Sequence, residues 1–78
     1  MCLFFKVAVT IWYGGKDSVL DYEFECGIFD FVDFCLHMFA SYPVVEIKAE
    51  TDEYTFIFDE RLQVLEFADT WFKALYSK

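Results

Sequence analysis

The sequence contains very little proline, glycine or histidine: one proline, three glycines and one histidine in 78 residues. Proline and glycine interrupt regular structure, so Pro43 predicts the end of a helix and Gly14-Gly15 a hairpin turn. The single histidine, His37, and the lack of a CxxC pair leave too few ligands for a zinc site. No glycine-rich phosphate loop is present either. We therefore expect no metal, no other cofactor and no enzymatic activity.

Long apolar segments are also lacking. No run approaches the roughly 18 apolar residues that a membrane span requires, and the first residues lack the features of a signal peptide. The three cysteines, Cys2, Cys26 and Cys35, cannot all pair with one another, so we expect reduced thiols, as is usual in the cytoplasm. These observations predict a cytoplasmic protein that does not bind membranes.

Basic residues are few: six Lys and Arg face fourteen Asp and Glu, which gives a formal net charge of −8. Nucleic-acid phosphates require a basic surface, so direct binding to nucleic acid is not expected. A basic protein partner is favoured instead. The alternative is that the charge only keeps a small apolar chain dispersed in water.

Hydrophobic residues, in contrast, are abundant, at 58% of the chain, and aromatic residues alone make up 23%. Each buried ring removes roughly 150–250 Å² from water. Eleven Phe, five Tyr and two Trp can therefore fill a core that most chains of this length struggle to build. We expect one domain that spans residues 1–78.

The spacing of these hydrophobic residues predicts the order of the elements. Residues 3–13 and 19–26 alternate with a period of two and are expected to form strands around a turn at 14–18. From Gly27 the period is that of a helix, which Pro43 ends, and residues 44–59 have the pattern of a second hairpin before a second helix. The order ββα-ββα with short connections predicts a two-layer α+β fold. Its four-stranded antiparallel sheet has the order 2-1-3-4, both helices cover one face, and the other face is open to water.

The same periods predict which side chains lie in the core. Phe4 and Trp12 of the first strand, and Phe34 of the first helix, are expected on exposed surfaces as aromatic contacts for a partner or a second copy. The side chains expected to point inward include Tyr13, Leu20, Phe24, Phe31, Val45, Tyr54, Phe56, Leu65, Trp71 and Phe72.

Carboxylates are expected to dominate the open sheet face, where only Lys6 and Lys48 oppose them. Charges on an edge strand also prevent sheets from aggregating. This interpretation accounts for the second strand, but less well for the glutamates of the third strand, which is not at an edge. The other interpretation is an acidic partner-binding surface formed by Asp21, Glu23, Glu25, Glu46, Glu50, Glu53 and Asp59.

In its short length, acidity, compact α+β order and lack of catalytic motifs, the chain resembles the small acidic anti-defence proteins of bacteriophages, including anti-CRISPR inhibitors. The resemblance implies a non-enzymatic inhibitor, in the host cell cytoplasm, that binds the nucleic-acid channel of an effector protein or an interface between its subunits. Its acidic face would imitate the charge of a nucleic-acid backbone. The alternative function is a self-associating structural or adaptor protein, a homodimer held by exposed aromatic rings.

Overall fold

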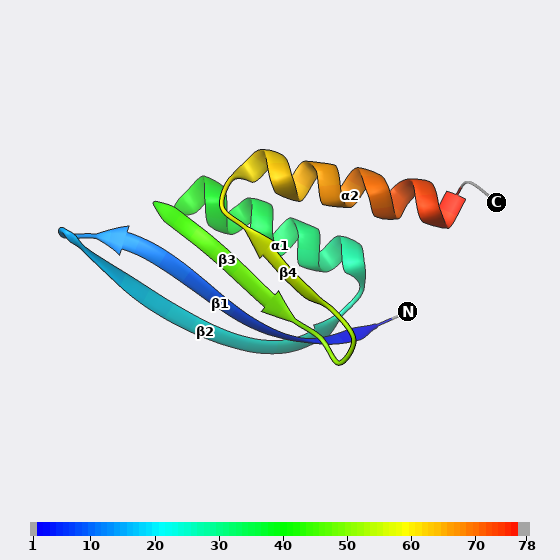
Figure 1. Ribbon diagram of the computed structural model, residues 1–78, viewed down its shortest axis with the longest axis horizontal. Helices are drawn as coiled ribbons and strands as arrows, with labels where there is room; N and C mark the ends of the chain where they lie inside the picture. Colours follow the sequence, from blue (N-terminus) through cyan, green and yellow to red (C-terminus); the bar gives the residue numbers. More distant parts are fainter. Residues whose placement is uncertain (1, 77–78) are drawn as a thin grey trace.

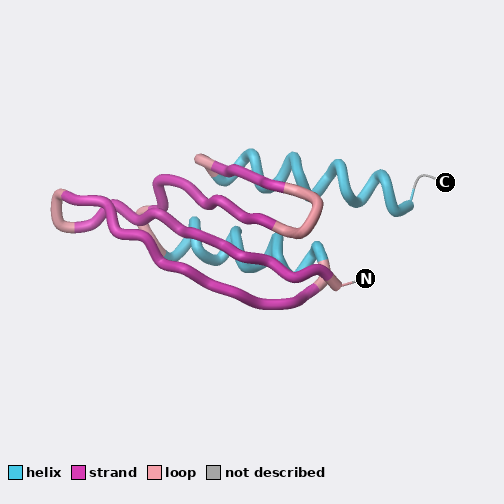
Figure 2. Tube along the Cα trace, turned by 60° about the horizontal axis from the view of Figure 1, so that its bottom comes forward, coloured by secondary structure: helices cyan, strands magenta, loops and turns pink. Residues whose placement is uncertain are grey.

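The computed structural model describes residues 2–76, with side chains as far as residue 74, and contains four strands and two helices (Figure 1). The strands pair antiparallel in the order β2-β1-β3-β4, and both helices lie on the same face of the sheet (Figures 1 and 2). The fold predicted from the sequence is thus confirmed. Along the chain the elements are β1 (Leu3–Tyr13), β2 (Lys16–Cys26), α1 (Ile28–Ser41), β3 (Val44–Glu50), β4 (Thr55–Phe58) and α2 (Arg61–Tyr76).

A two-residue turn joins β1 to β2. Gly14 and Gly15 have φ angles of +64° and +85°, a conformation that glycine adopts without steric cost and that matches the twist of a tight hairpin. The strands pair without a break from Leu3 opposite Cys26 to Tyr13 opposite Lys16. The second strand therefore begins earlier than the sequence pattern indicated, and Asp17 belongs to it rather than to the turn.

The closed end of this hairpin extends beyond both helices (Figure 1). The molecule is consequently elongated, with a longest dimension of 48 Å and a radius of gyration of 12.9 Å, against about 11.5 Å for a compact domain of this length. Tyr13 and Leu20 were predicted to point into the core, but they are 75% and 38% exposed. The prediction was wrong because alternation identifies the face of a strand and not how far a helix covers it.

The core lies between the sheet and α1. Phe31 of α1 is fully buried, and its ring stacks on that of Phe5 at 4.4 Å between centroids. The described residues include no buried polar or charged side chain, so apolar contact alone holds the two layers together. Buried side chains are Phe5, Val7, Val9, Ile11, Ile28, Phe31, Val32, Cys35, Met38, Ile47, Ala49, Phe58 and Val64.

Phe34 was expected on the solvent side of α1, but it is partly buried. Its ring lies 5.3 Å from that of Tyr22 and 5.1 Å from that of Phe24, both on β2. The reason is that the sheet is wider than one helix. A side chain on the flank of α1 therefore reaches the outermost strand and fills the angle between them.

The second helix is less buried than its apolar stripe predicted. Phe67 and Trp71 pack partly buried against the core, and the ring of Phe67 lies 4.7 Å from that of Phe56. Leu65 and Phe72, expected in the core, are 40% and 54% exposed. Because α2 lies beside α1 and over the short edge strand β4, only part of its circumference is covered (Figure 2).

Two further predicted core residues lie outside the core. The pairing of β1 and β3 shifts so that Thr10 is opposite Glu46 and Ile11 is opposite Val44, which leaves Val45 as an extra residue in a β-bulge. Val45 is 44% exposed as a result. Tyr54 precedes β4 in the turn after β3 and is 47% exposed.

Candidate acidic binding surface

The outer sheet face, meaning the face turned away from the helices, carries the candidate site. Residues directly opposite each other on paired strands share a face, so the observed register defines its members. Lys6 of β1 is opposite both Glu23 and Glu50, and Ala8 is opposite both Asp21 and Lys48. The charged side chains on the strands of this face are Asp17, Asp21, Glu23, Glu25, Glu46, Glu50, Lys6 and Lys48.

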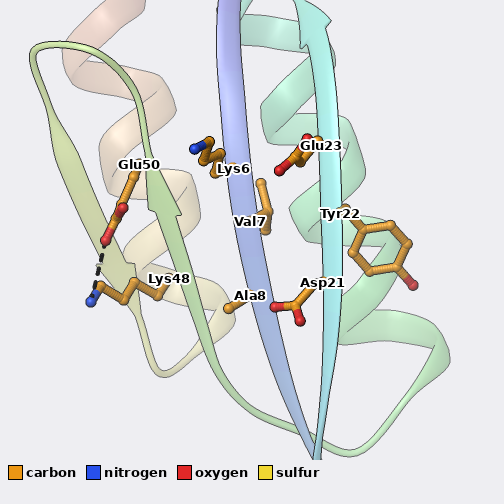
Figure 3. A pocket seen from close by; sticks show the side chains of 8 residues that line it. All are labelled: Lys6, Val7, Ala8, Asp21, Tyr22, Glu23, Lys48 and Glu50. Atoms are coloured by element: carbon orange, nitrogen blue, oxygen red, sulfur yellow. Dashed lines mark ion pairs between the residues drawn. The ribbon is translucent and has the colours of Figure 1, made fainter.

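The two lysines lie in the middle of the face. Lys48 Nζ forms an ion pair with Glu50 Oε1 at 3.3 Å (Figure 3). Lys6 lies in the same cross-strand row as Glu23 and Glu50, between the two carboxylates. The centre of the face is therefore partly neutralised by the two lysines that the sequence pattern placed on it.

Around these lysines the face forms an open depression of about 390 Å³. The carboxylates of Asp21 and Glu23 lean toward β1, whereas the Tyr22 ring points away from the depression (Figure 3). Five of its eight lining residues are charged and it is open to water, unlike the enclosed, mostly apolar pockets that bind small molecules. The depression suits a contact with the side chains of another protein. Its lining residues are Lys6, Val7, Ala8, Asp21, Tyr22, Glu23, Lys48 and Glu50.

The negative charge is least compensated along β2. Glu25 is opposite Phe4, and Asp17 is opposite Trp12, so neither carboxylate has a lysine in its row. Glu46 on β3 is opposite Thr10 and likewise has no lysine beside it in the register. The carboxylates without a lysine in their row are thus Asp17 and Glu25 on β2 and Glu46 on β3.

Glu53 and Asp59 are separated from the other predicted acids. Glu53 lies in the turn between β3 and β4, and Asp59 lies between β4 and α2, so they flank the two ends of β4. The backbone N–H of Asp59 donates a hydrogen bond of 2.6 Å to Gln63 Oε1 at the start of α2. Of the seven predicted carboxylates, the sheet thus brings five together, namely Asp21, Glu23, Glu25, Glu46 and Glu50.

The predicted aromatic contacts do not form one patch. Phe4 and Trp12, 43% and 54% exposed, lie on the outer sheet face near opposite ends of β1. Phe34 packs between α1 and β2 on the other side of the sheet. Trp12 instead belongs to the exposed hairpin tip, with Tyr13, Val19 and Leu20.

Two of the three thiols, Cys26 and Cys35, have raised pKa values. Burial raises the pKa of the Cys35 thiol to about 12, with a smaller contribution from Cys26, so Cys35 stays protonated at neutral pH. Burial, and to a lesser extent the Asp30 carboxylate and the Cys2 thiol, also raises the pKa of Cys26. All three cysteines are free, and His37 is exposed. Within residues 2–76 no three His, Cys, Asp or Glu side chains are grouped so that they could hold a metal ion.

Asp17 is a member of the outer sheet face that sequence reasoning missed. It was assigned to a turn because glycine, lysine, aspartate and serine cluster at 14–18. The signal that identifies it is the Gly14-Gly15 pair, since two glycines between alternating segments favour a two-residue hairpin loop. The strand then resumes at Lys16, and Asp17 shares a face with Asp21.

Comparisons with models of protein families, with curated proteins and with solved structures found no match to this chain. None of the described helices is long and apolar enough to cross a membrane.

Proposed function

We propose that this chain is a non-enzymatic binding protein whose outer sheet face occupies a basic surface of another protein. The observation that carries the proposal is the composition of this face: six carboxylates and two lysines on the side of the sheet that neither helix covers. Neighbouring like charges on a sheet cost folding free energy. A partner that neutralises them removes that cost, and the opposite potentials accelerate association.

The spacing of the carboxylates on β2 supports a partner that ordinarily binds nucleic acid. Alternate residues of a strand lie about 6.7 Å apart, whereas each phosphate of one strand of a DNA duplex advances about 3.4 Å along the helix axis. Asp21, Glu23 and Glu25 therefore form a row with about half that charge density. With Asp17, the row is about 27 Å long. Such a row imitates a phosphate backbone and blocks the basic groove that binds one, as the resemblance to anti-CRISPR inhibitors implies.

The ionisable groups also favour inhibition by blocking a partner's surface rather than by a catalysed reaction. A nucleophilic cysteine requires a lowered pKa, whereas the pKa of Cys35 is raised to about 12 by burial. Five of the six carboxylate residues of the outer sheet face are exposed, and Glu46 is partly exposed, which suits long-range attraction.

The proposal is tested by capturing proteins from a lysate of the host cells on the immobilised chain. Bound proteins are eluted in parallel with duplex DNA, with RNA and with an uncharged polymer at the same salt concentration. We expect release by a nucleic acid and not by the uncharged polymer. Captured proteins that no nucleic acid displaces contradict the proposed partner class.

A second candidate function is self-association through the hairpin tip. The observation that favours it is the exposure of Trp12, Tyr13 and Val19, at 54%, 75% and 57%, at an end of the sheet that no helix covers. Light scattering at low and high salt distinguishes the two functions. A dimer held by apolar contact persists at high salt and is lost in Trp12→Ser, whereas an acidic binding protein with a charge of −8 stays monomeric at low salt.

A further inference from the structure

A second cavity lies at the opposite end of the sheet from the hairpin tip. It has a volume of about 220 Å³ and is lined by three segments that are distant in the sequence: the start of β1, the β3–β4 turn and the second half of α2. Figures 1 and 2 both show the β3–β4 turn beside the start of β1. The lining residues are Leu3, Phe4, Thr51, Asp52, Glu53, Tyr54 and Trp71.

The walls of this cavity are aromatic, and its rim is acidic. The rings of Tyr54 and Trp71 meet edge to face at 6.4 Å, and Phe4 is 43% exposed beside them. Asp52 and Glu53 are both exposed. Among the side chains that the structure describes, residues 2–74, no lysine or arginine lines the cavity.

Thr51 holds the turn that carries the two carboxylates. Its backbone N–H donates to the Tyr54 carbonyl at 2.8 Å, and its Oγ1 accepts hydrogen bonds from the N–H groups of Tyr54 and Glu53 at 2.9 and 3.3 Å. A turn fixed in this way loses little conformational entropy when a ligand binds, so the site is preorganised.

We propose that this cavity binds the side chain of an arginine supplied by the basic partner. Anionic ligands are excluded by the carboxylates, and the volume is below the roughly 300–1,000 Å³ typical of sites for small organic ligands. An arginine side chain has an apolar stem that fits against Leu3 and Phe4, and a planar cation that stacks on aromatic rings and donates to carboxylates. That the arginine comes from a basic protein partner rests on the proposed function. That the cavity can bind an arginine side chain does not.

The test uses a defined probe, N-acetyl-arginine amide, and its uncharged isostere, N-acetyl-citrulline amide. Trp71 lines the cavity and reports binding by fluorescence in a Trp12→Phe background, where it is the remaining tryptophan. We expect saturable binding of the arginine probe, with citrulline weaker by about tenfold. Equal binding of both probes, or no saturable binding of arginine, overturns the proposal.

Matched variants locate the bound probe. Asp52→Asn with Glu53→Gln should weaken arginine binding by about five- to tenfold, whereas Asp33→Asn with Glu60→Gln, equal in charge but at exposed positions that do not line the cavity, should leave it unchanged. An equal loss in both pairs means general attraction by net charge and overturns the proposal. The probe requires no protein partner, so the two proposals are tested separately. Absence of arginine binding would not contradict partner binding by the outer sheet face. Absence of partner binding would not contradict arginine binding by the cavity.

Discussion

The rings of Phe5 and Phe31 stack at 4.4 Å with only 7° between their planes, and both side chains are fully buried. Phe5 comes from the central strand β1 and Phe31 from the second turn of α1, so this pair joins the sheet to the helix layer. The ring of Phe31 also lies within 6.3 Å of those of Phe56, Phe58 and Phe67, which extends the contact to β4 and α2.

Phe31→Ala should therefore lower the free energy of unfolding by about 3–5 kcal/mol, because it removes the ring on which three elements converge. Phe72→Ala, at a side chain that is 54% exposed, should cost only about 1 kcal/mol. Urea unfolding of both variants measures the difference. Similar losses in the two variants would show that Phe31 is not the centre of the core.

The raised pKa of the Cys35 thiol predicts a loss of stability at high pH. In the folded chain Cys35 keeps its proton up to a pH of about 12, whereas in the unfolded chain it loses the proton above about 9. Stability from this group is complete below pH 9 or so and falls between these two values, by at most about 1.4 kcal/mol per pH unit. Unfolding in urea at a series of pH values measures the slope.

The control for this prediction is Cys35→Ala, which lacks the thiol. It should be less stable than the natural chain at neutral pH, since it leaves a small cavity, but its stability should decline less between pH 9 and 12. Parallel pH profiles for the two proteins would mean that other groups cause the decline.

The row formed by Glu23, Lys6 and Glu50 predicts an effect of a single lysine on stability. Lys6→Gln leaves the two carboxylates facing each other across β1 and should cost about 0.5–1 kcal/mol at low salt. Lys16→Gln removes the same charge at the hairpin tip and should cost almost nothing. The difference should shrink at high salt. Thermal melts at two salt concentrations would show equal costs if the register of this row were wrong.

The sequence was sufficient to predict the order of the strands and most of the faces, because a period of two determines the side of a sheet on which each residue lies. It correctly placed Val7, Val9 and Ile47 in the core and Glu23 and Glu50 outside. It could not predict the exposure of Tyr13 or Phe72, since that depends on how far the two helices extend over the sheet.

The candidate site was partly predictable for the same reason. Alternation grouped the acids of β2 and β3, but the neutralising position of Lys6 between Glu23 and Glu50 follows from the register across three strands. The arginine cavity was not predictable, because Phe4, Asp52 and Trp71 come from distant segments whose meeting depends on the path of α2 over β4.

A charge-reversed variant tests whether the uncompensated acids of the outer sheet face bind the partner. Asp17→Lys, Glu25→Lys and Glu46→Lys together reverse the three carboxylates that have no lysine in their cross-strand rows. Asp33→Lys, Glu60→Lys and Glu66→Lys change the net charge equally at exposed positions on and beside the helices. Both variants should fold, since single changes at exposed positions typically alter stability by about 0.5 kcal/mol or less.

The most direct measurement is the affinity of these three proteins for the captured partner, titrated at about 50 and 200 mM salt. For the natural chain and for the helix-side variant, we expect the affinity to fall steeply as salt rises. The variant of the outer sheet face should bind at least about a hundredfold more weakly at low salt, with little dependence on salt, because each reversal turns an attraction into a repulsion. Equal affinities of the two variants, with thermal melts that show both folded, would contradict the claim that the outer sheet face makes the contact.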